Sequence, residues 1–433
     1  MKVCVVGMWH LGTVTAACLA AAGHHVVGLD FDNDLIEQLR AGQPPVFEPG
    51  LEDLLRQGLA SGHLAFETDQ VAAVSGAQVV WLAYDTPVDE DDRADVEYVF
   101  QQAQSLFPDL AADVLLLISS QVPAGTTRRL ERAYATAFPE RTILFAYSPE
   151  NLRLGKAIRV FTQPDRIVVG VRDVRARQMA AQLLAPFTDQ IEWMSVESAE
   201  MTKHALNAFL ATSVAFINEV AVLCEQVGAD AKEVEQGLKT EARIGPKAYL
   251  SPGSAFAGGT LARDVNFMIG LGKTGQRPTH LMAAVLESNE AHKHWPRQKL
   301  LELLGDVSGH QIAVLGLTYK PGTDTLRRSA SVELCRWLLA QSASLQVHDP
   351  RIHTLPPALA GARLCAAPET TLAGCEAAVI ATEWPDYLAL SADQFVASMA
   401  VPLVLDPNRF LAKNVASDAR IRYETVGKAA VHG

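Results

Sequence analysis

The feature that most constrains this chain is the strand–turn–helix unit at its start. Lys2–Val6 has the composition of a short buried strand, and residues 7–12 form a turn that begins and ends with glycine. Thr13–Ala22 follows as a small-residue helix, and His25–Asp30 is a second strand pattern. A strand, a crossover helix and a second strand in this order predict a parallel βαβ unit.

The same alternation continues and then begins again near residue 311. Strand patterns end in polar turns at Asp85-Thr86 and at Ser120-Gln121, and a helical stretch without Gly or Pro runs from Ser198 to about Val227. A second series of strands starts at Gln311. We therefore predict an α/β protein with two Rossmann-like, doubly wound parallel-sheet domains joined by a long central helix. The expected domains are residues 1–197 for NAD binding, 198–300 for a central helical and dimerisation region, and 308–433 for a second Rossmann-like, nucleotide-sugar-binding domain.

Composition excludes several other classes of protein. The 433 residues carry a formal charge of −12 without any run of Lys and Arg, which argues against nucleic-acid partners. The six cysteines are scattered singly, so neither a disulfide framework nor a metal site is predicted. No uninterrupted apolar run approaches the roughly 18 residues of a membrane helix. A reducing cytoplasm is the simplest location.

The first turn resembles a dinucleotide fingerprint with one departure. That fingerprint has glycines at the first, third and sixth positions, and the third lets the backbone approach the pyrophosphate. Here the six residues run from Gly7 to Gly12 with Trp9 in the middle. If NAD binds here, either its pyrophosphate lies higher on the N-terminus of the helix or the indole ring turns away. The alternative is a βαβ unit that binds no cofactor. Asp30 is placed to bind ribose hydroxyls and no Arg follows it, which favours NAD over NADP.

Other candidate cofactor contacts come from the same reasoning. The ligand crevice of a parallel sheet lies at the carboxyl ends of its strands, so Thr86 and Ser120 are candidates, although either residue is equally consistent with an ordinary turn. The expected cofactor contacts in the first domain are therefore Gly7, Trp9, His10, Leu11, Gly12, Asp30, Thr86 and Ser120.

A loop of small residues from Gly253 to Gly259 leads to Thr260 and then to the charged pair Arg263-Asp264. Small residues let a backbone approach a ligand closely, and Thr260 occupies the place of a nucleophile. Standing alone, the loop is as consistent with a glycine-rich helix entry. Lys203 and Asn207 are four residues apart, so they share one helix face and can reach the same ligand atom.

The order and spacing of these segments resemble the UDP-glucose/GDP-mannose dehydrogenase family. Further matches run almost from end to end of the chain: Phe47–Gly50, Ser148–Glu150, Pro164–Arg166, Glu200–Asn207, Arg243–Gly245, Gly316–Lys320 and Glu383-Trp384. The resemblance implies two NAD-dependent oxidations at C6 of a nucleotide-linked hexose, a UDP-hexose here, by a homodimer. It also implies roles for particular residues: catalysis by Glu150, Lys203, Asn207, Thr260 and Asp264; cofactor contacts at Arg263 and Arg327; substrate contacts at Arg243, Tyr249, Gly253, Lys320 and Arg409.

The chain departs from that family at its chemical centre. The family uses a cysteine thiolate to capture the intermediate aldehyde, and Thr260 stands at that position. A threonine hydroxyl without a dedicated base is a poor nucleophile. Gln121, Leu154 and Arg263 replace a Thr, a frequent Glu and a Lys. Several functions are therefore open: complete oxidation through a hydrated aldehyde, a single oxidation or epimerisation, a catalytically silent regulator that binds sugar nucleotides, and a different dehydrogenase on the same fold.

Overall fold

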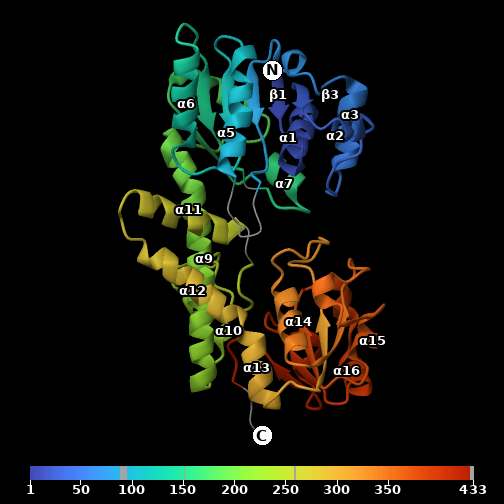
Figure 1. Ribbon diagram of the computed structural model, residues 1–433. Helices are drawn as coiled ribbons and strands as arrows, with labels where there is room; N and C mark the ends of the chain where they lie inside the picture. The colour runs from blue at the N-terminus through green and yellow to red at the C-terminus, as the bar shows by residue number, and fades with distance from the viewer. Residues whose placement is uncertain (88–94, 151, 258–259, 430–433) are drawn as a thin grey trace. The chain divides into compact units, whose positions relative to one another are not determined.

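The computed structural model describes residues 1–87, 95–150, 152–257 and 260–429. The chain forms two compact units, Met1–Ala205 and Leu206–Gly433. Figure 1 shows that each unit contains a sheet with helices packed against it. Gly258 and Gly259 of the small-residue loop lie outside the described residues.

The first unit is built on an eight-stranded sheet in the order β3-β2-β1-β4-β5-β6-β7-β8. Neighbouring strands are parallel except β6 and β7, which are antiparallel. The predicted doubly wound sheet is confirmed, with this antiparallel pair near one edge, a common addition to doubly wound sheets. The strands are β1 (Lys2–Val6), β2 (His25–Leu29), β3 (Leu64–Glu67), β4 (Val79–Leu82), β5 (Leu115–Ile118), β6 (Leu144–Tyr147), β7 (Ile167–Val171) and β8 (Ile191–Met194).

Helices cover both faces of this sheet because alternate residues of each buried strand point to opposite sides. Val3 and Val5 of β1 belong to one core cluster, and Cys4 and Val6 belong to the other. The helices are α1 (His10–Ala21), α2 (Asn33–Arg40), α3 (Leu51–Ser61), α4 (Gln70–Val74), α5 (Val96–Ser105), α6 (Thr126–Ala137), α7 (Ala157–Thr162) and α8 (Val174–Leu184).

Helix α1 begins three residues earlier than the expected Thr13. Trp9 has an extended backbone (φ −71°, ψ −154°) and is the N-cap, so His10, Leu11 and Gly12 are already helical. The turn between β1 and α1 is therefore shorter than the sequence suggested.

The second unit contains a six-stranded, fully parallel sheet in the order β11-β10-β9-β12-β13-β14, which confirms the second Rossmann-like domain. Its strands are β9 (Gln311–Leu315), β10 (Ser344–His348), β11 (Arg363–Leu364), β12 (Ala377–Ile380), β13 (Leu403–Leu405) and β14 (Arg422–Glu424). Its helices are α10 (Ala231–Thr240), α11 (Thr260–Thr274), α12 (His280–Lys293), α13 (Trp295–Leu304), α14 (Ala330–Ala340), α15 (Pro368–Leu372), α16 (Ala392–Ser398) and α17 (Ala412–Val415).

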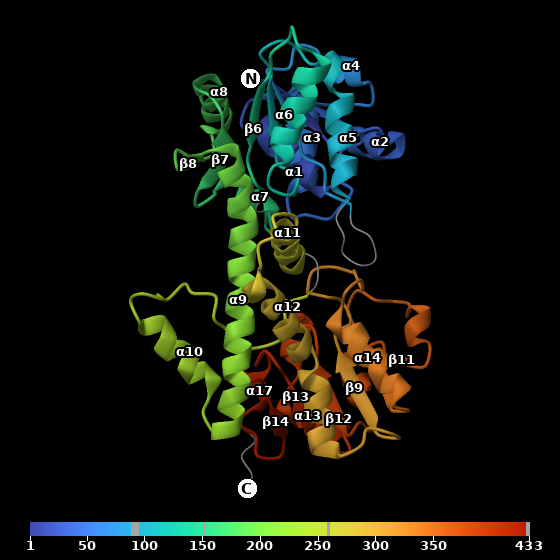
Figure 2. The same cartoon turned by 60° about the vertical axis from the view of Figure 1, so that its left-hand side comes forward.

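The predicted long helix is α9 (Val196–Val227), whose first ten residues belong to the first unit and whose remainder belongs to the second. Figure 2 shows it as one continuous helix. By length and composition it could cross a membrane, with a hydropathy of 1.6 over its most apolar 18-residue window, of which 44% is buried. Core helices meet the same criterion. The buried polar side chains Glu200, Lys203 and Asn207 of α9 all have hydrogen-bond partners within the protein.

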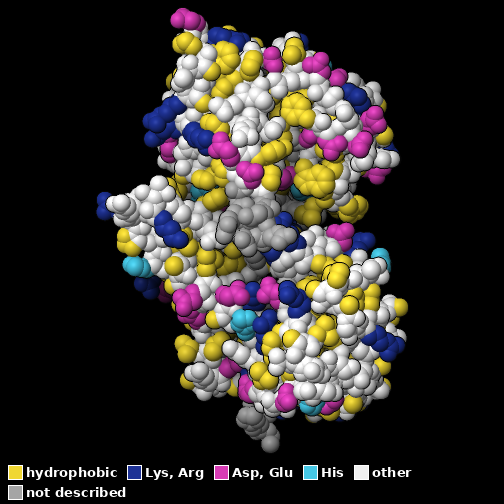
Figure 3. Space-filling view, viewed as in Figure 1, with side chains coloured by type: hydrophobic (Ala, Val, Ile, Leu, Met, Phe, Trp, Pro, Cys, Tyr) yellow, Lys and Arg dark blue, Asp and Glu magenta, His cyan; other side chains and the backbone are white. Residues whose placement is uncertain are grey.

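Most charged side chains of both units lie at the surface, although some, such as Glu200 and Asp349, are buried. On the face drawn in Figure 3, basic and acidic side chains are intermixed in each unit rather than gathered by sign. Several of them form ion pairs, such as Arg172 with Glu131 and Glu197 in the first unit and Lys293 with Glu333 in the second. The net charge of −12 comes from the first 100 residues, which contain 16 Asp and Glu against 4 Lys and Arg, while the rest of the chain has 33 of each sign.

Candidate active site

The glycine turn of the first unit leaves no room for side chains at its two ends. A Cβ on Gly7, whose φ is +90°, would lie 2.7 Å from the Tyr84 ring. A Cβ on Gly12 would lie 1.7 Å from the Gly7 carbonyl oxygen. Both glycines are therefore required for α1 to pack closely on β1 and to present its N-terminal N–H groups, the arrangement that accepts a dinucleotide pyrophosphate.

Trp9 needs no such freedom. Its φ of −71° is available to every L-residue, and its side chain is 52% exposed. The indole is therefore half exposed to solvent at the start of α1. The middle position of the turn therefore tolerates a large residue.

Polar groups at the carboxyl ends of the strands face this turn. Asp30, just after β2, accepts the Met8 N–H at 2.7 Å and the Asp32 N–H at 3.1 Å, and it remains partly exposed. The Ser120 hydroxyl after β5 is buried without a hydrogen-bond partner among the described residues. The Thr86 hydroxyl donates to the Gln121 carbonyl at 2.6 Å. An orphaned buried hydroxyl and a cradle that only glycine fits are consistent with a bound dinucleotide.

His10 and the motif Phe47–Gly50 meet at the start of α7. Glu48 is buried and accepts the N–H groups of Gly155 and Ala157, each at 2.8 Å. His10 Nε2 lies 3.3 Å from the same carboxylate. Glu48 therefore caps α7 from a distant part of the chain and fixes the His10 ring at the first turn of α1.

The first turns of α9 hold two loops of the first sheet. Lys203 Nζ donates to the Glu150 carbonyl at 2.6 Å and lies 3.5 Å from its carboxylate. Glu200, one turn earlier, accepts from the Gly125 and Thr127 N–H groups and from the Thr127 hydroxyl, and burial raises its pKa. The structure thus brings Glu150 and Lys203 together.

The second unit brings together two more of the predicted catalytic residues. The Asn207 amide donates to the Asp264 carboxylate, and both side chains are buried. Thr260 is the first residue of α11 and is exposed. Asn207 is one helical turn beyond Lys203 on α9, as the spacing predicted.

The cysteines offer no substitute nucleophile. All six are free and buried. Burial raises the pKa of Cys4, Cys18 and Cys335 to about 12, with Glu48 adding to the effect at Cys18. Since the thiolate is the reactive form, these thiols are inert. Among the described residues, no group of three or more His, Cys, Asp and Glu could hold a metal ion.

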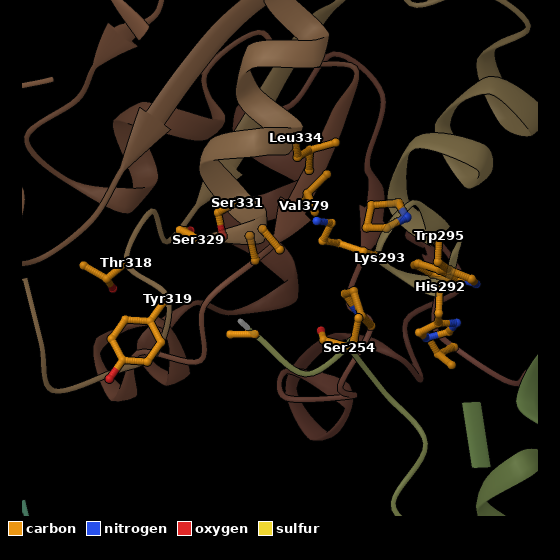
Figure 4. A pocket seen from close by; sticks show the side chains of 17 residues that line it. Ser254, His292, Lys293, Trp295, Thr318, Tyr319, Ser329, Ser331, Leu334 and Val379 are labelled. Carbon is orange, nitrogen blue, oxygen red and sulfur yellow. The ribbon is translucent and has the colours of Figure 1, made fainter. Parts of the chain in front are cut away.

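A cavity of about 110 Å³ lies within the second unit. Figure 4 shows Ser329 and Ser331 where α14 begins, Ser254 on the loop before α11, and Lys293 and Trp295 at the junction of α12 and α13. Thr318 and Tyr319, from the turn after β9, also line the cavity. Hydroxyl groups beside a helix N-terminus and two aromatic rings form a lining suited to a polar ligand that has an aromatic part.

The predicted substrate and remaining cofactor residues have different surroundings. Gly253 and Lys320 adjoin residues of the cavity wall, Tyr249 is exposed, and Arg243 is exposed and paired with Glu241. Arg409 is engaged by Asp230, with 2.6 Å between guanidinium and carboxylate, and by the Val426 carbonyl. Burial alone would raise the pKa of Asp230, but hydrogen bonds from Arg409 and the Lys232 N–H lower it. Arg263 lies on α11, and Arg327 is exposed before α14.

The sequence reasoning missed the cavity residues His292, Lys293, Trp295, Ser329 and Ser331. One signal was available: Ser329 directly precedes α14 and Ser331 lies in its first turn, at the start of the helix that follows the first strand of the second Rossmann-like unit. Nothing local in the sequence distinguishes the other three.

The fold and these sites define a class. A glycine-turn Rossmann unit, a long connecting helix and a second Rossmann unit with a polar cavity are the parts of a two-domain NAD-dependent oxidoreductase. Comparison with known proteins narrows the class. Residues 1–188, 197–291 and 313–413 match the NAD binding, central and UDP binding domains of the UDP-glucose/GDP-mannose dehydrogenase family.

Individual relatives cover nearly all of the chain. A UDP-glucose 6-dehydrogenase of Rhizobium meliloti (strain 1021) is 34% identical over 436 residues, covering 99% of this chain and 100% of the relative. UDP-glucose 6-dehydrogenase YwqF of Bacillus subtilis (strain 168) is 33% identical, covering 100% and 98%. The solved structure of a UDP-glucose dehydrogenase from the hyperthermophilic archaeon Pyrobaculum islandicum superimposes with a TM-score of 0.87 at 32% identity, covering 99% and 98%.

The chain belongs to the UDP-glucose/GDP-mannose dehydrogenase family and is an NAD-dependent nucleotide-sugar dehydrogenase.

Proposed function

We propose that this protein oxidises C6 of a UDP-hexose with NAD and forms no covalent intermediate with the enzyme. The observation that carries the proposal is the pairing of buried Asn207 with buried Asp264, on a chain that has Thr260 in place of the cysteine. Of the two nucleotides in the family's name, UDP is supported by the relatives, which are UDP-glucose dehydrogenases.

NAD, when bound, supplies the hydride acceptor, and the residues proposed to hold it are Gly7, Gly12, Asp30 and Ser120. A Gly12 without space for a Cβ supports this assignment, as does a Ser120 hydroxyl that has no partner among the described residues. Asp32 and Asp34 follow Asp30, so negative charge stands where a 2′-phosphate would have to bind. We expect NADP to bind more weakly.

For the sugar, we propose that Lys203 stabilises the oxyanion that develops at C6 and that a carboxylate accepts the hydroxyl proton, directly or through water. The aldehyde then adds water to give a hydrate, and Asp264 accepts the proton of that water. Asn207 supports this role because its amide fixes the orientation of the carboxylate. The hydrate then loses a hydride to a second molecule of NAD, and with loss of one hydroxyl proton the product is the carboxylic acid, so no thiol is required.

The nucleotide part is proposed to bind in the cavity of the second unit. Its hydroxyl-bearing wall and the aromatic rings of Tyr319 and Trp295 support a nucleoside diphosphate. Lys320 follows the wall residue Tyr319, and its Nζ lies 5.4 Å from the centre of the Tyr319 ring, so a positive charge stands beside the proposed nucleotide site. We propose three domains, formed by residues 1–197, 198–300 and 308–433. We also propose that the protein is cytoplasmic.

We further propose a homodimer formed through α9. Five apolar residues of this helix stand at heptad-like spacings of three, seven, seven and four, and all are exposed: Leu206 (38%), Phe209 (68%), Phe216 (50%), Leu223 (58%) and Val227 (79%). A heptad stripe on one helix is complementary to a second copy of itself around a two-fold axis. A second copy of this chain is therefore the expected occupant of that face.

The test counts hydrides per sugar. UDP-glucose and NAD are incubated with the protein, NADH is followed by absorbance, and the sugar product is identified by mass. Two NADH per sugar and a uronic acid product support the proposal. One NADH per sugar and an aldehyde product would favour a single oxidation, an alternative that is considered because position 260 has no thiol. If no UDP-hexose or GDP-hexose yields NADH, the result would favour the alternative in which the protein binds sugar nucleotides as a catalytically silent regulator.

The covalent question has its own test with Thr260→Cys. Position 260 is exposed at the N-terminus of α11, where the pKa of a thiol is lowered. After rapid quenching in acid, which preserves a thioester, intact-mass measurement should show no sugar adduct on the natural protein and a sugar adduct on the cysteine variant. An adduct on Thr260 itself would refute the water mechanism.

A further inference from the structure

The short segment before Thr260 is held by side chains rather than by secondary structure. Gly253, Ser254 and Phe256 belong to neither a helix nor a strand, yet the peptide N–H and carbonyl of each have a side-chain partner. These partners come from α9, from α12 and from the turn after β13: Asn218, Asn289, His292 and Asn408.

Asn289 makes the most complete of these contacts. Its Oδ1 accepts the Phe256 N–H at 2.9 Å, and its Nδ2 donates to the Phe256 carbonyl at 2.9 Å. The side chain is buried. Because the N–H can only donate and the carbonyl can only accept, the pair of bonds fixes the orientation of the amide. Asn289 therefore pairs with Phe256 as a neighbouring β-strand would.

Asn218 and Asn408 hold the other end of the segment. Asn218 accepts the Gly253 N–H at 3.0 Å and donates to the Ser254 carbonyl at 3.4 Å, while Asn408 accepts the Ser254 N–H at 2.7 Å. A Cβ on Gly253 would lie 2.3 Å from the Asn408 Oδ1. Glycine is thus required at 253 to admit the Asn408 amide.

His292 closes the set from the cavity side. Its Nε2 donates to the Gly253 carbonyl at 2.7 Å, and burial lowers its pKa. A neutral imidazole that donates from Nε2 has an acceptor at Nδ1, so His292 holds the loop without placing a positive charge in the cavity wall.

We propose that Asn289 is a positioning residue for the nucleotide-sugar reaction, acting through the loop that leads to Thr260. The loop contributes Ser254, Ala255 and Ala257 to the cavity wall, so its position sets the shape of that wall. Asn218, His292 and Asn408 hold the same segment at its other end. The kinetic part of this inference rests on the proposed function, since it concerns the same substrate site.

The test compares Asn289→Leu and Asn289→Asp with Asn414→Leu. Asn414 is the matched control because its amide also donates to backbone carbonyls of the second unit, those of Leu388 and Leu390, and it does not line the cavity. Loss of loop position should lower kcat/KM for UDP-glucose by about 100-fold in the leucine variant. KM for NAD should not change, and the Asn414→Leu control should retain the natural kinetic constants.

The pH dependence of turnover in Asn289→Asp distinguishes a positioning role from a general loss of folding stability. The variant's carboxylate still accepts the Phe256 N–H but donates nothing, whereas its protonated form regains the donor. We therefore expect its turnover, relative to the natural protein, to rise as the pH is lowered toward the pKa of that carboxyl group. A flat ratio would contradict the proposal, as would an Asn289→Leu variant within twofold of natural kcat/KM.

Hydrogen exchange separates this inference from the proposed function. Amide exchange of residues 253–257 should be about tenfold faster in Asn289→Leu than in the natural protein, corresponding to the loss of roughly one hydrogen bond. The Asn414→Leu control should not change it. If the natural protein oxidises no sugar nucleotide, the proposed function is wrong, but the exchange measurement still shows whether Asn289 positions the loop. If exchange of residues 253–257 is the same in Asn289→Leu and in the natural protein, Asn289 does not position the loop.

Discussion

Replacing Gly12 by Ala tests whether the close approach of α1 to β1 makes the cofactor site. The added Cβ would lie 1.7 Å from the Gly7 carbonyl oxygen and 2.8 Å from the Gly7 carbonyl carbon. To reach 3.0 Å from the oxygen, the turn or the helix must move by 3.0 − 1.7 = 1.3 Å. Both groups are backbone, so no side chain can rotate away, and we expect a loss of stability of about 1–3 kcal/mol.

The same displacement moves the N–H groups that would bind a pyrophosphate. Hydrogen bonds to a charged acceptor contribute about 1.5–3 kcal/mol each, so losing one should weaken NAD binding by roughly 10- to 100-fold. Calorimetric titration with NAD measures the affinity, and urea unfolding measures the stability. UDP binding to the same preparation checks that the second unit is folded.

Gly237→Ala is the matched control. Gly237 lies inside α10 without a positive φ, and a Cβ there would meet no other atom of the described residues within 4 Å. Alanine at this position should therefore stabilise the helix by about 0.5–1 kcal/mol and leave NAD binding unchanged. A Gly12→Ala protein that binds NAD with natural affinity would refute the reasoning, because the packing of glycine against Gly7 would then not be what forms the site.

Three further predictions concern other parts of the chain. Asp30→Ala should weaken NAD binding by at least roughly tenfold in calorimetry, because the carboxylate that anchors the Met8 N–H is removed. Phe216→Glu should convert a dimer to a monomer in sedimentation, and an unchanged dimer would exclude the α9 stripe as the interface. A hydrogen bond from Arg172 lowers the pKa of Glu197 to about 2 from 4.5, so this pair stabilises the protein fully above pH 4.5 and progressively less as the pH falls toward 2. Arg172→Gln should therefore cost about 1 kcal/mol at pH 7, and in urea unfolding the difference from the natural protein should vanish near pH 2.

The fold was largely predictable because its signals are local. Short apolar runs followed by turns located β1, β5 and β9 to within a few residues, and the absence of Gly and Pro located α9. The start of α1 was placed too late because the sequence suggested a turn through Gly12, whereas the extended backbone of Trp9 lets the helix begin at His10. The antiparallel β6–β7 pair left no sign in a sequence that otherwise alternates strand and helix.

The surroundings of the site were less predictable because they depend on partners distant in the sequence. The ion pair of Arg409 with Asp230 joins residues 179 apart, and the capping of α7 by Glu48 joins residues 109 apart. Asn289 reads as a polar residue in an amphipathic helix, and only the fold places it against Phe256. Spacing within one helix, as for Lys203 and Asn207, was the exception that could be read directly.

The two Rossmann-like units use one backbone arrangement in different ways. In the first, Gly7 donates to the Leu29 carbonyl and Met8 donates to Asp30; in the second, Gly316 donates to the His348 carbonyl and Leu317 donates to Asp349. The glycines have similar φ values, +90° and +97°.

The two carboxylates differ in what else reaches them. Asp349 is buried, and one of its oxygens also accepts from the Thr318 N–H, the Thr318 hydroxyl and the Trp384 indole. Asp30 is partly exposed, and within the described part of the first unit it accepts from the Met8 and Asp32 backbone. The Oδ2 atom of Asp349 already accepts from four donors within the protein and the side chain is buried, whereas the partly exposed Asp30 can still accept from a ribose hydroxyl. The same strand–turn–strand arrangement is therefore open to a dinucleotide ribose in the first unit, while in the second it fixes the turn that carries Thr318 and Tyr319 to the cavity.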